Sequence, residues 1–502
     1  RSFPDLLYNG GAALIGANDK EIVMPIFYDI NGKLHWKIND NNSLSWQIYT
    51  GFDEWRSYSD SDYEGIEQQN RAGFGWRTTM TSPRYERKLT RNRTLTALLY
   101  YTNLNNFDYQ RNKYKENGAS NDTKNVVSSQ LTEIGGKIWM QQAFNTNNNL
   151  TYGLETSVRD YIPNHIYRKV NGHKTSYDDG HLKLYSLSGY VHHEMKYKGW
   201  LFDFGLRTSV YKSGRTTKFA IEPRIKANTF LNEKNKLMFA YDRMVQPVHT
   251  VNEMRYSVRN DFWIPFQENN LAGSHQFSIG RKNYTPSNFN FSVEAYYKRM
   301  DNLLLINNLE SYLDFHQDYQ VGKGKSMGFE VMAEYSKNRF TAWLSYSLSK
   351  STRTFGSKTY AFKYDAPHDV SASVSYVVLK KAKRTNTLSA NMQFKSGYPY
   401  LISEISYPGA GVPGSGAGST WFDRESVDYF GDRPNIRLKP FFRMDINYTI
   451  EKKRKHGSSI LQLSLLNATG NTNVYTVYKK GDKYKALTLI PFLPSISFTR
   501  KF

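Results

Sequence analysis

Two adjacent histidines, His192 and His193, are the side chains in this sequence that most resemble a chemical site. Imidazole nitrogens are common zinc ligands and common acid–base catalysts. The pair lies in GYVHHEMKY, a segment with the alternation of a β-strand, in which neighbouring side chains point to opposite faces. Two rings on opposite faces are poorly placed to share one metal ion, so the sequence favours a structural role for both.

Three other stretches have the residue types of a site without its spacing. GAGVPGSGAG (409–418) has the glycines of a phosphate-binding loop but lacks the following Lys-Ser/Thr and opens no helix, which indicates a surface loop. DSDYEGIE (60–67) lacks the ligand spacing of an EF-hand, and KKRK (452–455) lies between two expected strands, so both are interpreted as solvated segments. The sequence therefore predicts no enzyme, no cofactor and no metal.

The composition narrows the class of protein. Only 39% of the 502 residues are apolar, and no run approaches the ~20 consecutive apolar residues of a transmembrane helix. Aromatic residues make up 15%, which fits many strands and many interfacial side chains, and there is no cysteine. The net charge of +22 fits either a polyanionic partner, such as nucleic acid or a phosphorylated membrane surface, or the sum of many basic turns. We favour the second explanation, that the charge is the sum of many basic turns. The sequence has no basic helix or stacking platform, so we expect no nucleic-acid partner.

Alternation of apolar and polar residues runs through the whole chain. In PIFYDINGKLHWKI (25–38), Tyr28, Ile30, Leu34 and Trp36 share one face of an extended chain, and polar residues occupy the other. The last residues, SISFTRKF (495–502), repeat the pattern. About 20 such segments occur and none has a sustained helical period, so the fold class is all-β.

The connections between these segments differ systematically in length. Short polar turns are expected at 39–42, 145–149, 196–199, 232–236, 336–339 and 451–458, and long loops at 54–71, 110–124, 161–180, 247–273, 304–322, 351–365 and 398–437. Short turns at one end and long loops at the other are typical of a transmembrane β-barrel. A β-sandwich or β-propeller explains this asymmetry less well. It also explains less well the inward polar positions Asn290, Ser292 and Glu294, which suit a water-filled lumen and would be costly in a dry core.

The sequence thus predicts a large antiparallel transmembrane β-barrel, one domain over residues 1–502. Near mid-bilayer we expect Leu344 and Val374 to face lipid, together with the row of Tyr28, Ile30, Leu34 and Trp36. A barrel must close, so we expect the last strand to pair with the first. Ile496, Phe498 and Phe502 would then mark the closing strand.

Several stretches in order resemble one family, the TonB-dependent outer-membrane receptors. They are RSFPDLL (1–7), PIFYDINGKL (25–34), EPRIKANTFLNEKNKLMFAYDRMVQPVH (222–249), NFSVEAYYKRMDNLL (290–304), 322–355, KYDAPHDVSASVSY (363–376), FKSGYPY (394–400), FFRMDINYTI (441–450) and the terminal IPFLPSISFTRKF. The resemblance implies a barrel of about 22 strands with a lumen filled by a plug. It also implies that a terminal aromatic such as Phe502 is a signal for barrel assembly.

The resemblance also implies location, partners and function. RSFPDLL resembles the end of the second barrel strand, so we expect the plug and first strand on a longer chain or on a separate plug chain. The implied protein lies in the outer membrane of a Gram-negative bacterium, contacts TonB through the plug, meets lipopolysaccharide and other outer-membrane lipids, and could carry a surface lipoprotein. It would import a scarce nutrient such as a siderophore, glycan, peptide or vitamin.

Two other functions remain open at this point. A passive channel or surface-binding barrel would need no plug of its own, and a soluble all-β binding or glycan-processing protein would have a single apolar core. Ligand contacts in an importer would come from the long-loop end, where Tyr398, Tyr400 and Tyr407 are the candidates.

Overall fold

The computed structural model describes the chain from residue 21 to residue 501 with short gaps. The described ranges are 21–63, 66–116, 119–178, 180–251, 262–266, 271–283, 288–306, 319–408, 426–431, 433–455, 457–480, 483–488 and 492–501. Within these ranges the regular elements are all strands, which confirms the all-β class. No helix long and apolar enough to cross a membrane occurs in the described part of the chain.

One large antiparallel sheet of 21 strands contains most of the described residues. Its strands are β1 (Glu21–Lys37), β2 (Asn42–Tyr63), β3 (Ile66–Thr90), β4 (Arg93–Glu116), β5 (Ala119–Asn145), β6 (Asn148–Val170), β7 (His173–Asp178), β8 (Leu182–Tyr197), β9 (Trp200–Ser213), β10 (Thr216–Asn232), β11 (Asn235–Gln246), β14 (Ala272–Asn283), β15 (Phe289–Ile306), β16 (Tyr319–Lys337), β17 (Phe340–Phe355), β18 (Lys358–Ala361), β19 (His368–Lys381), β20 (Arg384–Lys395), β25 (Phe441–Lys453), β26 (Ser458–Leu466) and β29 (Leu493–Lys501).

Four two-stranded ribbons accompany the sheet. They are β12 (Val248–Val251) with β13 (Phe262–Pro265), β21 (Pro399–Tyr400) with β24 (Ile436–Arg437), β22 (Ser403–Pro408) with β23 (Ser426–Phe430), and β27 (Val474–Lys480) with β28 (Lys483–Thr488).

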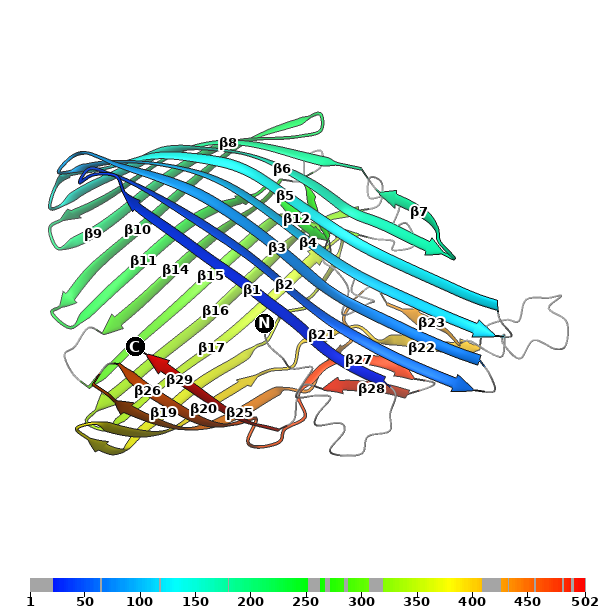
Figure 1. Cartoon of the computed structure of the whole chain (residues 1–502). Coiled ribbons are helices and arrows are strands. Elements are labelled where there is room, and N and C mark those ends of the chain that lie inside the picture. The colour runs from blue at the N-terminus through cyan, green and yellow to red at the C-terminus, as the bar shows by residue number, and fades with distance from the viewer. Residues whose placement is uncertain are drawn as a thin grey trace.

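The strands tilt and wrap into a barrel-like wall with two unlike ends (Figure 1). At one end, which we name the short-turn end, hairpins close over a few residues: β1 ends at Lys37 and β2 begins at Asn42, and β16 ends at Lys337 and β17 begins at Phe340. The ribbons β21–β24, β22–β23 and β27–β28 lie at the opposite, long-loop end (Figure 1). The two-ended asymmetry expected from the sequence is therefore confirmed.

One face of the sheet is apolar from its first strand to its last. In antiparallel sheets directly paired residues share a face, so the face can be followed from strand to strand. Starting at Trp36 it passes through Leu44, Tyr85, Ala97, Ile138, Leu154, Gly189, Thr208 and Ile221, and further on through Ile225, Tyr241, Phe277, Tyr297 and Met327, through Leu344, Ala372, Met392 and Met444, and through Leu463 to Ile496.

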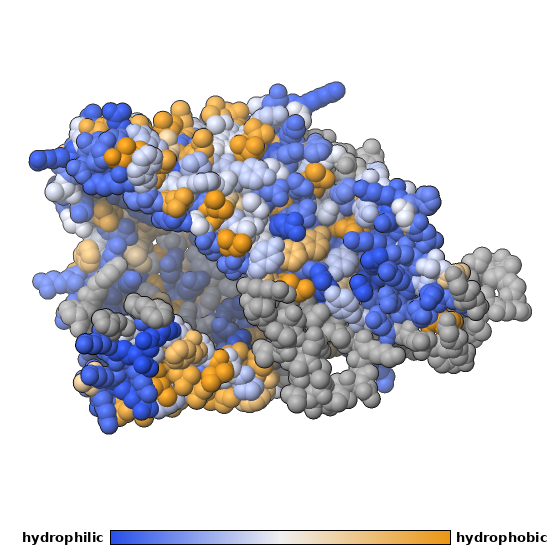
Figure 2. Space-filling model, viewed as in Figure 1, coloured by the Kyte–Doolittle hydropathy of each residue, from blue (hydrophilic) through white to orange (hydrophobic). Residues whose placement is uncertain are grey.

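The opposite face is polar. It carries Ser345, Ser347, Ser349 and Ser351 on β17, with Ser371, Ser373, Asn391, Gln393, Asp445, Asn447, Gln462, Ser464, Ser495 and Ser497 across the following strands. Asn290, Ser292 and Glu294 lie on this face too, as expected. Hydrophobic residues gather on the outside of the wall between hydrophilic ends, and the view looks into a hollow between the upper and lower walls (Figure 2). The polar face therefore lines the lumen.

Four stretches expected to be long loops are mostly strand, and one of them is 351–365, where β17 runs to Phe355 and pairs with β18. The hairpins β2–β3 and β4–β5 stay paired through residues 54–71 and 110–124, and β6 continues to Val170 and pairs there with β7. Beyond the apolar belt no lipid imposes an apolar face, so the alternation fades while the backbone ladder continues. The loop prediction was wrong for these segments, which form a β-extension of the wall at the long-loop end.

The closure expected from the sequence does not occur between the described strands. β1 pairs with β2 and β29 pairs with β26, and no pairing joins β29 to β1. The first barrel strand was expected outside this sequence, so the pairing of the last strand with the first stays a prediction. Phe502 lies outside them.

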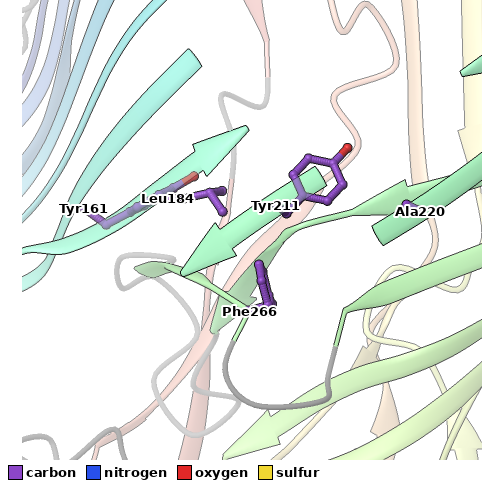
Figure 3. Packing of buried hydrophobic residues seen from close by; sticks show 5 residues of the cluster. All are labelled: Tyr161, Leu184, Tyr211, Ala220 and Phe266. Carbon is purple, nitrogen blue, oxygen red and sulfur yellow. The ribbon is translucent and has the colours of Figure 1, made fainter. Parts of the chain in front are cut away.

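A hairpin between β11 and β14 packs against the lumen face. Phe266, which follows β13, is fully buried against Leu184, Tyr211 and Tyr161 of the wall, as the close-up shows (Figure 3). Its backbone N–H donates to Pro247 O over 2.9 Å and so closes the base of the hairpin. This cluster, completed by Ala220, is the apolar core of the described residues.

Candidate functional site

Aromatic rings and cations gather at the long-loop end, around β17, β18 and the start of β21. We name this group the aromatic–cation cluster and define it by the rings of Tyr360, Phe362, Tyr364 and Tyr398 and the cations of Arg353, Lys395 and Arg433. Arg353 and Lys395 lie on the lumen face by register, because Arg353 pairs with Gly324 and Tyr360, and Lys395 with Asp369. The cluster therefore borders the mouth of the lumen.

Each cation lies over a ring. The Arg353 Cζ atom lies 3.9 Å from the Phe362 ring centroid, the Arg433 Cζ atom 5.2 Å from that of Tyr360, and Lys395 Nζ 6.0 Å from that of Tyr398. Tyr364 meets both Phe362 and Tyr398 edge-on. Rings held by cations and by other rings are ordered in advance, which lowers the entropy lost when a ligand binds.

An ion pair between a buried carboxylate and a partly exposed guanidinium anchors the cluster to the wall. The Asp365 carboxylate, 3% exposed, accepts from the Arg437 guanidinium over 2.5 Å and from the Ser351 backbone N–H over 2.6 Å. Arg437 also donates to Gly397 O over 3.0 Å. A Cβ atom at Gly397 would come within 1.6 Å of Leu438 O, so only glycine allows the two backbones to approach this closely. The loops that carry the cluster are fixed by these contacts.

The three tyrosines proposed from the sequence have different surroundings. Tyr398 belongs to the cluster. The Tyr400 hydroxyl donates to Val477 O over 3.0 Å and lies 3.1 Å from Thr476 Oγ1, so it ties β21 to β27. Tyr407 lies in β22, paired with Val427. A ligand-binding role for any of them stays a prediction.

Sequence reasoning missed most of the cluster. Arg353, Tyr360, Phe362 and Tyr364 all lie in RTFGSKTYAFKYD (353–365), which was interpreted as one long loop. Its signal is an aromatic residue at every second position, 360, 362 and 364, next to basic residues. A period of two is typical of a short extended segment with its aromatic side chains on one face.

The lumen wall below this end carries a ladder of ion pairs. Glu155 bridges Lys137 and Arg207 at 3.0 and 2.9 Å, and Arg159 meets Glu133 at 2.9 Å. The pairs of Glu155 with Lys137 and of Arg159 with Glu133 join the neighbouring strands β5 and β6, and the pair of Glu155 with Arg207 reaches across β8 to β9. Charges in such a setting are paired because an isolated charge would be costly to desolvate.

His192 and His193 point to opposite faces, as the sequence indicated. His192 Nε2 lies 2.6 Å from Asp203 Oδ1 on the lumen face, while His193 pairs with Phe204 on the apolar face. One potential ligand atom each from His192, Glu194 and Asp203 lies within 4.8 Å of the others, in a cluster open to the lumen. The short His192–Asp203 contact accounts for the pair without an ion.

Every residue expected to face lipid lies on the apolar face. Tyr28, Ile30, Leu34 and Trp36 are between 40% and 66% exposed, and Leu344 and Val374 are 44% and 43% exposed. Ile496 and Phe498, at 71% and 65%, extend the same face to β29. Contact of these side chains with lipid, and a role for β29 in barrel assembly, stay predictions.

Comparison with solved structures shows which known folds this one resembles. The chain is similar to BauA, the ferric preacinetobactin receptor from Acinetobacter baumannii, with a TM-score of 0.59, 9% identity and coverage of 96% of this chain and 79% of that one. It is also similar to FyuA, the ferric yersiniabactin uptake receptor from Yersinia pestis, with a TM-score of 0.59, 9% identity and coverage of 96% of this chain and 79% of that one. A third similar structure is the ferric-catecholate import receptor Fiu from Escherichia coli, with a TM-score of 0.57, 10% identity and coverage of 96% of this chain and 81% of that one.

Comparison of the sequence itself gives the family. No curated protein matches this chain. The sequence model of the family described as TonB dependent receptor-like, beta-barrel matches residues 25–468, which is most of the chain. Proteins of this family are receptors and transporters rather than enzymes. An all-strand wall with an apolar outer face and a polar lumen, together with this match, shows that the chain belongs to the TonB-dependent receptor β-barrel family.

Proposed function

We propose that this barrel imports a scarce, anionic nutrient across the outer membrane of a Gram-negative bacterium by coupling to TonB. The observation that carries the proposal is the aromatic–cation cluster, in which Arg353 and Arg433 lie over rings at the mouth of the lumen. Guanidinium groups pair with carboxylates or phosphates, and aromatic faces stack on planar groups. A ligand with both features matches the cluster best.

The relatives support the same ligand class. BauA is a receptor for ferric preacinetobactin and FyuA an uptake receptor for ferric yersiniabactin. We propose a metal chelate of the siderophore kind as the first ligand to test, ahead of neutral glycans. In this account the short turns face the periplasm, a plug contacts TonB, and the barrel provides the passage and no bond-breaking chemistry.

The test is ligand binding to the purified barrel in detergent. A panel of anionic ferric chelates and neutral oligosaccharides is titrated against the wild type, Arg433→Gln and Tyr398→Ala, with Arg339→Gln in the β16–β17 turn as the control. Arg433→Gln removes a charged donor to the anionic chelate, which should weaken its binding about tenfold. The control should bind like the wild type.

Two results would contradict the proposal. Tight binding of a neutral glycan with no effect of Arg433→Gln would remove the anionic ligand class. Uptake by whole cells that persists without TonB would replace active import by a passive channel.

A further inference from the structure

One imidazole and two carboxylates come together on the lumen face of β8 and β9. His192 and Glu194 are alternate residues of β8 and so share a face, and Glu194 pairs directly with Asp203 on β9. His192 Nε2 lies 2.6 Å from Asp203 Oδ1, and one potential ligand atom of each residue lies within 4.8 Å of the other two. We name His192, Glu194 and Asp203 the His–carboxylate cluster.

No lysine or arginine offsets the negative charge of this cluster. Glu194 and Asp203 are directly opposed, and like charges in that position destabilise a sheet. Lys226 on β10 is the register partner of Asp203, but no lysine or arginine in the described part of the chain forms an ion pair with either carboxylate. The Asn149 amide nitrogen lies 3.4 Å from a Glu194 oxygen, and an amide carries no net charge. The two acids therefore favour a bound cation.

A second pair of opposed carboxylates shows what the histidine adds. Glu294 on β15 pairs directly with Glu330 on β16, also on the lumen face. Among the described residues no third potential ligand joins that pair. Oxygen ligands alone suit Ca²⁺ and Mg²⁺, whereas an imidazole nitrogen suits transition metals such as Zn²⁺, Fe²⁺ and Ni²⁺. His192 thus distinguishes the His–carboxylate cluster from an ordinary acidic patch.

The wall holds the three ligands in place and leaves room for an ion. They lie within strands whose pairing has an unbroken register. Gly205 is the direct partner of His192 on β9, and a Cβ added there would meet nothing nearer than Arg224 Cβ at 3.5 Å. Metal–ligand bonds of about 2.1 Å set ligand atoms about 3.4 Å apart in a tetrahedron, so small side-chain rotations reach that geometry.

The cluster is also accessible from the lumen. The side chains of His192 and Asp203 are 36% and 27% exposed, and Glu194 is exposed. The cluster lies near the short-turn end, because β8 stops at Tyr197. An aqueous ion can therefore reach it, and water can fill the coordination positions that three protein ligands leave open.

We propose that the His–carboxylate cluster binds a divalent transition-metal ion of the Zn²⁺ class. The ligands are His192 Nε2 and one oxygen each of Glu194 and Asp203. The bound ion replaces the His192–Asp203 hydrogen bond with two metal bonds and joins β8 to β9. The ligand is the aqueous ion rather than a ferric chelate, so the proposal rests neither on TonB nor on the aromatic–cation cluster.

The experiment measures Zn²⁺ binding to the full chain, purified in detergent without a polyhistidine tag and stripped with a chelator. Zn²⁺ alone is titrated in a calorimeter against the wild type, His192→Gln and Glu194→Gln. Two controls remove the same groups elsewhere. His193→Gln removes the neighbouring imidazole on the apolar face, and Glu330→Gln removes one carboxylate of the Glu294–Glu330 pair. Heat-modifiable mobility on gels shows that each variant is folded.

The wild type should bind one Zn²⁺ at the cluster, and each test variant should bind it about 100-fold more weakly. Loss of a mere outer-shell partner already lowers metal affinity about 10–100-fold, and these variants lose a direct ligand. Both controls should bind like the wild type, and excess Ca²⁺ should not displace Zn²⁺.

Three results would overturn the proposal. They are a wild type that binds no Zn²⁺, test variants that bind it as tightly as the wild type, and displacement of Zn²⁺ by an equal concentration of Ca²⁺, which would identify an unselective acidic patch. Each of these results leaves chelate binding at the aromatic–cation cluster unaffected, so the proposed function is tested separately.

Discussion

At the scale of single residues, neighbouring side chains of one strand lie in different environments, one on the apolar outer face and the next on the polar lumen face. Leu344 and Ser345 on β17 pair with Ala372 and Ser371, so the first lies on the apolar face and the second on the lumen face. A two-residue period makes this assignment sensitive to a shift of a single position. The same pattern placed Tyr28 and Val374 on the apolar face from sequence alone, because alternation is a local property.

A charge placed at Leu344 should block assembly. Leu344→Arg puts a guanidinium on the apolar face, where a charge at mid-bilayer costs about 2–4 kcal/mol. We expect little folded protein in the outer membrane, measured by heat-modifiable mobility, whereas Ser345→Arg, directed into the wet lumen, should assemble normally. Equal yields of the two variants would contradict the register.

The ion pair in the β4–β5 hairpin should titrate at low pH. Hydrogen bonds from the Arg111 guanidinium hold the pKa of Asp122 below its usual range, and this pair lies beyond the membrane-spanning part of the wall. A depressed pKa means that the pair stabilises the hairpin fully above the ordinary aspartate pKa of about 3.9, and that this contribution is lost as pH falls through the lower folded pKa.

The check is a carboxyl carbon NMR titration of Asp122. The midpoint should lie below about 3.9 in the wild type and rise in Arg111→Gln. An unchanged midpoint in the variant would show that Arg111 does not cause the shift.

At the scale of elements, the sequence was informative where lipid or a tight turn dictates residue types. The turns at 39–42 and 336–339 are rich in Asn, Asp and Lys, and the structure has hairpin ends at both. The extensions at 54–71 and 110–124 were mistaken for loops because, outside the membrane, both faces of a strand can be polar. The aromatic–cation cluster was missed since its members come together only through pairs such as Arg353 with Tyr360.

The inward hairpin depends on Phe266. This side chain is fully buried among Leu184, Tyr211 and Tyr161, and Phe→Ala at such sites costs about 3–5 kcal/mol. We expect Phe266→Ala to release the segment between β11 and β14 while the wall stays folded, seen as faster limited proteolysis within residues 247–271. Phe277→Ala is the control, because that ring is 53% exposed on the apolar face. Equal protease resistance of both variants would show that Phe266 does not hold the hairpin.

At the scale of the whole molecule, the two faces and the two ends together define an oriented membrane wall. The apolar face turns outward, the ion-paired face surrounds the lumen, and the aromatic–cation cluster borders its mouth. The proposed import depends on this orientation, with the long-loop end toward the exterior. None of this could be read from one segment, because it arises from register accumulated over the sheet.

The most direct measurement is cysteine accessibility in intact cells. The chain has no cysteine, so a single Ser357→Cys in the β17–β18 turn and a single Asp40→Cys in the β1–β2 turn give signals without background. A membrane-impermeant maleimide should label Ser357→Cys in intact cells, and Asp40→Cys only after the outer membrane is permeabilised. Labelling of Asp40→Cys in intact cells, with Ser357→Cys protected, would contradict the orientation on which the account rests.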